Sequence, residues 1–132
     1  MEKRPALSTE MVHEFVANAH GDLQRVQELL AQEPALLNAA WDWGGGDWET
    51  ALGAASHMGR RDIALYLLKH DARIDIFAAA MLGQVEIVQT LLQAFPDMAQ
   101  EKGPHGISLL DHAKAGGEEA APVLTFLQSL LQ

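Results

Sequence analysis

Hydrophobic residues recur along the chain in a frame that appears three times. A glycine, at Gly21, Gly59 or Gly83, is followed eight and nine residues later by a pair of leucines. Between each glycine and its leucine pair, apolar residues lie at the spacing of one face of an α-helix. A frame that recurs over tens of residues predicts stacked structural repeats, each of which buries its apolar face against its neighbours.

The same spacing predicts eight short helices. They span residues 9–19, 23–31, 51–58, 62–70, 76–82, 85–92, 109–115 and 118–131. Ser8 or Thr9, Thr50, Asp75 and Ser108 stand where they can cap helix N-termini. Each helix is too short to be stable alone, so stacking must supply the stability. The buried face expected for the last helix comprises Val123, Leu124, Leu127, Leu130 and Leu131.

Two connections contain residues typical of turns. Residues 38–49 include three consecutive glycines, Gly44 to Gly46, which exclude a helix and predict a hairpin-like loop. Residues 71–74 predict a tight reversal in which Asp71 adopts the left-handed conformation that usually favours glycine.

Composition and charge narrow the class of protein. A chain of 132 residues, 48% apolar and 20% charged, fits one globular domain over residues 1–132. A formal net charge of −9 would repel phosphate backbones and anionic lipid, so we expect no nucleic-acid and no membrane partner. The absence of cysteine excludes disulfides, thiolate metal sites and a cysteine nucleophile. With no secretory signal pattern and no apolar run long enough to span a membrane, we expect a cytoplasmic protein.

The segment from Thr50 to Gly59 resembles the ankyrin signature T-P-L-H-x-A-A-x-x-G, and Asp71 to Asp75 stands where that family has G-A-D-V-N. Gly106 to Gly117 is a weaker second copy, and the other two repeats share only the Gly and Leu-Leu frame. The resemblance implies an all-α ankyrin-repeat solenoid of four stacked helix-turn-helix repeats, with the outer two as caps. The repeats would span approximately residues 8–38, 46–74, 75–100 and 104–132.

The chain departs from the ankyrin pattern at several positions. Gly21 and Gly59 are 38 residues apart, against the family's 33, so the loop at residues 41–48 is enlarged. Gly59 and Gly83 are only 24 apart, so the hairpin finger before the third repeat is expected to be missing. Gly53 replaces the signature histidine, which in the family ties neighbouring repeats together.

The loop at residues 41–48 contains all three tryptophans, Trp41, Trp43 and Trp48. Tryptophan is enriched at binding hot spots, which makes this loop a candidate partner-binding site. The alternative is that the indoles fill the junction between the first two repeats.

The resemblance also implies which positions face a partner on the concave side. In the second repeat these are Glu49, His57 and Met58; in the third they are Met81 and Leu82. In the fourth repeat they are Ile107, Ala115 and Gly116. Met58, Met81 and Leu82 would form an adaptable apolar patch. The alternative is that neighbouring loops cover these three side chains.

Six histidines raise the possibility of a metal or catalytic site. His57 near Asp47 and Glu49, or His105 near Asp111 and His112, supply ligand types, but neither set has the spacing of a recognised motif. We therefore expect no catalytic residues, no metal ligands and no cofactor.

These observations favour a non-catalytic protein–protein interaction module that binds another protein through the concave face and the Trp-rich loop 41–48. A small-ligand-binding protein or enzyme, with an aromatic pocket closing over Glu49 and His57, is the alternative. A third possibility is self-association through Met81 and Leu82, so the chain is expected to be a monomer or a weak homodimer.

Overall fold

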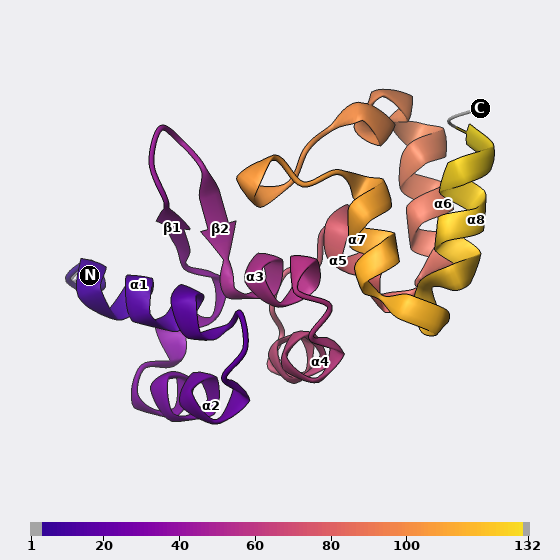
Figure 1. Cartoon of the computed structure of the whole chain (residues 1–132). Coiled ribbons are helices and arrows are strands. Elements are labelled where there is room, and N and C mark those ends of the chain that lie inside the picture. The colour runs from indigo at the N-terminus through magenta and orange to yellow at the C-terminus, as the bar shows by residue number, and fades with distance from the viewer. Residues whose placement is uncertain (1–3, 131–132) are drawn as a thin grey trace.

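The computed structural model describes residues 4–130 and is mostly helical. Within that range eight α-helices follow one another in four pairs (Figure 1). The pairs are α1 (Thr9–Asn18) with α2 (Leu23–Gln32), α3 (Ala51–His57) with α4 (Arg61–Lys69), α5 (Ile76–Leu82) with α6 (Val85–Ala94), and α7 (Leu109–Ala115) with α8 (Ala121–Leu130). The all-α prediction is confirmed, and Leu131, expected in the last helix, lies outside the described residues.

The first helices of the four pairs form a continuous row. α1 contacts α3, α3 contacts α5, and α5 contacts α7. α3 also contacts α7 directly, so the last pair lies close to the second as well as to the third. None of the described helices is long and apolar enough to cross a membrane.

The helices begin where the sequence provides a capping side chain. The side chains of Ser8, Thr50, Asp75 and Ser108 each accept a hydrogen bond from the backbone N–H three residues later. Such a bond satisfies one of the free N–H groups at a helix N-terminus. The capping predictions at these positions are confirmed, with Ser8 rather than Thr9 as the first cap.

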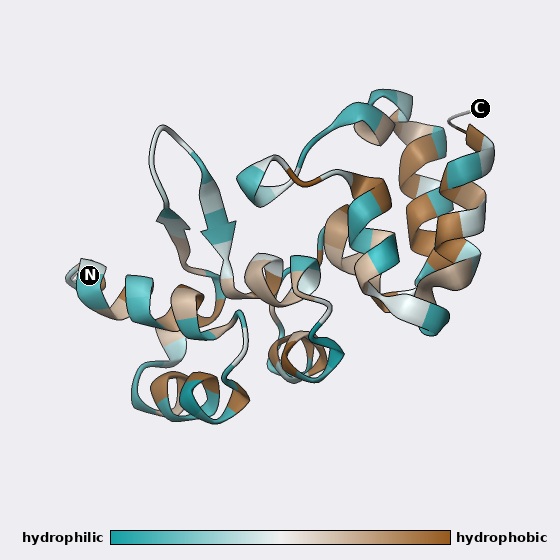
Figure 2. Ribbon diagram, in the orientation of Figure 1, coloured by the Kyte–Doolittle hydropathy of each residue, from teal (hydrophilic) through white to brown (hydrophobic). Residues whose placement is uncertain are grey.

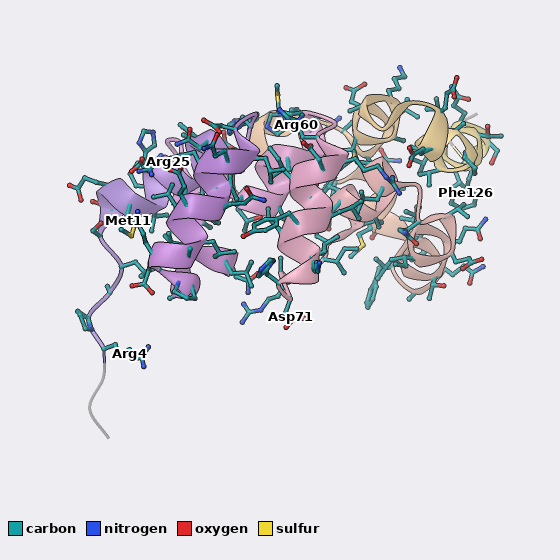
Figure 3. All side chains as sticks on the ribbon, turned by 90° about the horizontal axis from the view of Figure 1, so that it is seen from below. Arg4, Met11, Arg25, Arg60, Asp71 and Phe126 are labelled. Atoms are coloured by element: carbon teal, nitrogen blue, oxygen red, sulfur yellow. The ribbon has the colours of Figure 1, made fainter. Side chains whose placement is uncertain are left out.

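Arginines join the inter-helix turns of successive pairs. Arg60 donates to the carbonyl oxygen of Gly21, and Arg61 donates to that of Leu82. Arg60 and Asp71 mark opposite ends of α4, with Arg60 at the edge where the inter-helix turns lie (Figure 3). The turns are therefore connected by side chains as well as by packing of the helices.

The buried apolar residues form two clusters. The first lies among α1, α2, α3 and α4, and the second among α6, α7 and α8. α5 belongs to both, because Ala78, Met81 and Leu82 pack in the first cluster while Ile76 and Ala79 pack in the second. Hydrophobic segments lie along α2, α4, α6 and α8, while the inter-helix turns are coloured white to teal (Figure 2). In α8, Val123 and Leu127 are buried as expected, but Leu130 is exposed.

The connections between pairs differ in length and structure. Between α2 and α3 lie a 3₁₀ turn, Pro34–Asn38, and an antiparallel hairpin of β1 (Ala40–Asp42) and β2 (Trp48–Thr50). The hairpin-like loop predicted there is confirmed. Residues 70–75, between α4 and α5, contain no strand, and Asp71 has the predicted positive φ of 73°.

The connection between α6 and α7 reaches back toward the hairpin. It contains two 3₁₀ turns, Pro96–Gln100 and Pro104–Gly106, and an isolated bridge between Lys102 and Ser108. The backbone N–H of His105 donates to the Asp47 carboxylate over 2.8 Å, across 58 positions of the chain. Figure 1 shows this loop, in orange, approaching the β1–β2 hairpin. Two loops that are distant in the sequence therefore meet at this point.

Candidate functional site

The turn of the β1–β2 hairpin is organised by one aspartate and three glycines. The Asp42 carboxylate accepts hydrogen bonds from the backbone N–H groups of Gly44 and Gly46, at 2.8 and 3.0 Å. The three consecutive glycines, Gly44 to Gly46, have positive φ, which residues with a side chain adopt only with strain. The Gly-rich turn thus fixes the direction in which Trp43 leaves β1 and Asp47 enters β2.

Four side chains converge beside this turn. His20 follows α1, Glu49 lies in β2, His57 is the last residue of α3, and His105 lies in the 3₁₀ turn before α7. One nitrogen from each histidine and a carboxylate oxygen of Glu49 all lie within 4.8 Å of one another. We call these four residues the His-Glu cluster.

Glu49 is the centre of the His-Glu cluster and is only 1% exposed. Its Oε1 atom lies 3.1 Å from His20 Nε2, and its Oε2 atom lies 2.9 Å from His57 Nε2 and 3.3 Å from His105 Nε2. The indole N–H of Trp43 donates to Oε1 over 2.9 Å. Glu49 is therefore approached by three imidazoles and one indole.

The pKa of Glu49 reflects two opposing effects. Burial alone raises it, because a low-dielectric environment disfavours the charged form. The neighbouring imidazoles of His57 and His20, together with the Trp43 N–H, outweigh burial and lower the pKa below its ordinary value. Glu49 is consequently a carboxylate, although it is shielded from solvent.

The outer nitrogens of two histidines are held by acceptors. His20 Nδ1 lies 3.1 and 3.0 Å from the carbonyl oxygens of Val16 and Ala17. His105 Nδ1 lies 2.7 Å from Asp47 Oδ2. The pKa of Asp47 is lowered, chiefly by the hydrogen bond from the His105 backbone N–H. Because carbonyl and carboxylate oxygens only accept, these contacts place a proton on each Nδ1 and direct each Nε2 toward Glu49.

Two members of the His-Glu cluster are among the residues predicted from the sequence to bind a partner, and the other two are not. Trp43, Glu49 and His57 are all predicted partner-binding residues, and the fold brings them together. The sequence does not point to His20, and it suggests His105 only as a ligand with Asp111 and His112, because the cluster members are 29, 8 and 48 positions apart and form no local motif. One signal was present: His20 precedes Gly21 as Met58 precedes Gly59, which places it on the same side of the helix row.

The three tryptophans occupy different environments. Trp41 is half-buried and packs against the first hydrophobic cluster, with its ring 5.0 Å from that of His13. Trp43 is 37% exposed, and its ring lies beside those of His20 and His105. Trp48 is 61% exposed on β2. Trp41 therefore lies in the junction between the first two helix pairs, as the second alternative predicts, whereas Trp48 is exposed to solvent.

The predicted apolar patch does not form. Met58 is exposed, but Met81 and Leu82 are 1% and 3% exposed. Both side chains belong to the first hydrophobic cluster, and α7 and the Gly117–Ala120 turn pack closely against α5. The prediction that Met81 and Leu82 face a partner or a second copy of the chain is wrong, because neighbouring elements already cover them. Of the fourth-repeat positions, Ala115 is exposed, and Ile107 and Gly116 are partly buried.

A shallow apolar groove lies on the hairpin side of α1. It has a volume of about 260 Å³ and is lined by Leu7, Thr9, Val12, Ala40, Trp41, Asp42 and Trp48. The groove is distinct from the His-Glu cluster, since the two share no residue.

Comparison with known proteins does not assign the chain to a family: no family model and no curated protein matches it.

Proposed function

We propose that the protein is a non-catalytic binding module of the ankyrin type, which holds another protein against the β1–β2 hairpin. The observation that carries the proposal is the exposure of Trp48 on an ordered hairpin. A large apolar side chain that a rigid element holds in solvent is typical of a binding hot spot, because little ordering is required on association.

The groove beside Trp48 supports the same proposal. Its apolar walls from Leu7, Val12 and Trp41 fit an aliphatic or aromatic side chain of a partner. The net charge of −9 favours a partner whose surrounding surface is basic. The four helix pairs and the strand-free connection at residues 70–75 agree with a four-repeat ankyrin array that has no finger before its third repeat.

The alternative function is a small-ligand site at Trp43, Glu49 and His57. These side chains converge, but they contact one another rather than lining a deep pocket. Such an arrangement suits an ion better than an organic ligand.

The function can be tested by site-specific photo-crosslinking in lysate, with the crosslinker at position 48 or at position 95. Phe95 is a matched control, because it is 60% exposed but lies after α6, far along the chain from the hairpin. We expect one discrete crosslinked protein from position 48 that is absent from position 95. In affinity capture, Trp48→Ala should lose that protein and Phe95→Ala should retain it. Equal capture by both variants, or no specific crosslink at position 48, would contradict the proposal.

A further inference from the structure

We propose that His20, Glu49, His57 and His105 bind one divalent transition-metal ion of the zinc class. The proposal is independent of the binding function above, because it concerns other side chains. It rests on the convergence of four ligand atoms from four separate segments of the chain.

The distances among the ligand atoms suit a tetrahedral site. Zinc binds imidazole nitrogen and carboxylate oxygen at about 2.0–2.2 Å, so neighbouring ligand atoms in a tetrahedral site are about 3.3 Å apart. The contacts of Glu49 Oε2 with His57 and His105 measure 2.9 and 3.3 Å, and the contact of Glu49 Oε1 with His20 measures 3.1 Å. With one ligand atom from each residue, all four atoms lie within 4.8 Å of one another, so the side chains would draw together around an ion.

The placement of protons supports a cation at this point. Carbonyl acceptors at His20 and a carboxylate at His105 fix a proton on Nδ1 of each ring. With that proton on Nδ1, Nε2 is the nitrogen of each ring that faces an oxygen of Glu49, and it can coordinate a cation that lies between the two atoms. Metal-bound histidines are usually oriented in the same way, because the ring nitrogen that does not bind the metal donates its N–H to a carbonyl or carboxylate oxygen.

A second, independent observation concerns buried atoms. Glu49 Oε2 and His57 Nε2 are buried, and neither completes a hydrogen bond although they lie 2.9 Å apart. Leaving such atoms unpaired costs free energy, so buried polar groups of this kind need a partner. A metal ion coordinated by both atoms would satisfy them together.

The ligand types select the metal. Three imidazoles and one carboxylate suit zinc, cobalt, nickel or copper, whereas calcium and magnesium require mainly oxygen ligands. The charges of Glu49 and of Asp47 behind His105 together balance a divalent cation. Four protein ligands complete a tetrahedral shell, which is characteristic of structural rather than catalytic zinc sites.

The ion would join segments that are distant in the sequence. It would link the end of α1, strand β2, the end of α3 and the loop before α7. At this interface Gly53 stands where the ankyrin signature has a histidine. The metal would therefore brace the hairpin and the loop at residues 101–108 against the helix row.

The test uses the full-length chain without a histidine tag, freed of metal by a chelator. We expect the chain to bind Zn²⁺ and Co²⁺ at one ion per molecule, measured by chelator competition. The Co²⁺ form should show the visible absorption of a tetrahedral site, and Zn²⁺ should raise the melting temperature. Ca²⁺ should have no effect on any readout.

Variants separate a metal site from a network of hydrogen bonds. His105→Gln removes an exposed ligand and should lower zinc affinity at least tenfold while the far-UV circular dichroism stays native. Asp47→Asn should lower the affinity about 10-fold to 100-fold, because it removes the negative charge behind His105. His13→Gln is the matched control: its ring lies 5.4 Å from that of Trp43 but outside the His-Glu cluster, and it should bind as the wild type.

Two results would overturn the proposal. One is a wild-type chain with no stoichiometric zinc binding below about 100 μM, which would leave the cluster as an ion-pair network of Glu49 with protonated histidines. The other is equal zinc affinity in the wild type and in folded His105→Gln, which would place the binding elsewhere on the chain.

Discussion

Arg60 Nη1 donates a hydrogen bond to the carbonyl oxygen of Gly21 over 2.8 Å, although the two residues are 39 positions apart. The same guanidinium makes two further hydrogen bonds to the Asp62 carboxylate, at 3.0 and 2.9 Å. Asp62 thus holds Arg60 in position to bind the turn between α1 and α2. The contact connects the first helix pair to the second at its solvent edge.

Arg60→Ala should lower the urea midpoint of unfolding by a small but measurable amount, because the Gly21 carbonyl loses its donor. Arg73→Ala is the control, since Arg73 is exposed and outside the inter-helix turns. Equal midpoints for the two variants would show that the Arg60 contact contributes nothing to stability.

Leu67→Ala should destabilise the protein by about 2–5 kcal/mol, because it opens a cavity in the first hydrophobic cluster, where Leu67 is fully buried. Leu65→Ala, in the same helix but exposed, should change stability by less than about 0.5 kcal/mol. Urea denaturation of both variants gives the comparison. Near-native stability of Leu67→Ala would contradict the packing of α4 described above.

Gly83→Ala should destabilise the protein more than Gly45→Ala. Both glycines have positive φ, 80° and 65°, which costs about 1–2 kcal/mol for a residue with a side chain. At Gly83 an added Cβ would also overlap the carbonyl oxygen of Glu119, whereas at Gly45 nothing lies within 4 Å. Thermal and urea unfolding would check the order, and the reverse order would be inconsistent with the contact between α5 and the turn at residues 117–120.

Trp43→Phe should destabilise the protein by about 1–3 kcal/mol, because it removes the N–H donor to the buried Glu49 carboxylate. Trp48→Phe keeps an exposed aromatic ring and should stay within about 0.5 kcal/mol of the wild type. Chemical denaturation distinguishes them. Similar values for both variants would mean that the Trp43 hydrogen bond does not stabilise the fold.

Stability should also depend on pH through His112. Burial beneath Phe77 and α5 lowers the pKa of His112 below its ordinary value of 6.5, and the ring donates from Nδ1 to the Ser108 carbonyl over 2.8 Å. The unfolded chain therefore binds this proton more readily than the folded chain. The contribution of neutral His112 is fully present above pH 6.5 and is lost as the pH falls through the folded pKa.

The variant His112→Gln isolates this contribution from that of the other histidines. It should lose less stability than the wild type when the pH is lowered from 7 to 5, as measured by urea unfolding at each pH. Parallel losses in the two proteins would show that His112 does not titrate differently in the folded and unfolded states.

Much of the fold was predictable because its determinants are local. The caps at Thr50, Asp75 and Ser108 depend on a side chain and an N–H three residues away. The hairpin at residues 40–50 depends on consecutive glycines, and the reversal at Asp71 on a residue that tolerates positive φ. Each of these features is determined within a few positions of sequence.

The His-Glu cluster could not be predicted in the same way. His105 reaches Asp47 and Glu49 only because the loop before α7 lies beside the hairpin. That placement accompanies the direct packing of α7 against α3, a contact between segments far apart in the sequence. The packing of α7 and of the turn at residues 117–120 against α5 explains the error at Met81 and Leu82, since the predicted open face assumed a regular array.

The sharing of α5 between the two hydrophobic clusters has a consequence for how the chain responds to damage. This helix has only seven residues, some of which pack in the first hydrophobic cluster and the others in the second. Neither cluster is complete without it. A defect near α2 and a defect near α8 both act on the same short helix. The two hydrophobic clusters are therefore coupled through α5, and local unfolding at either end of the chain should spread through α5 to the other end.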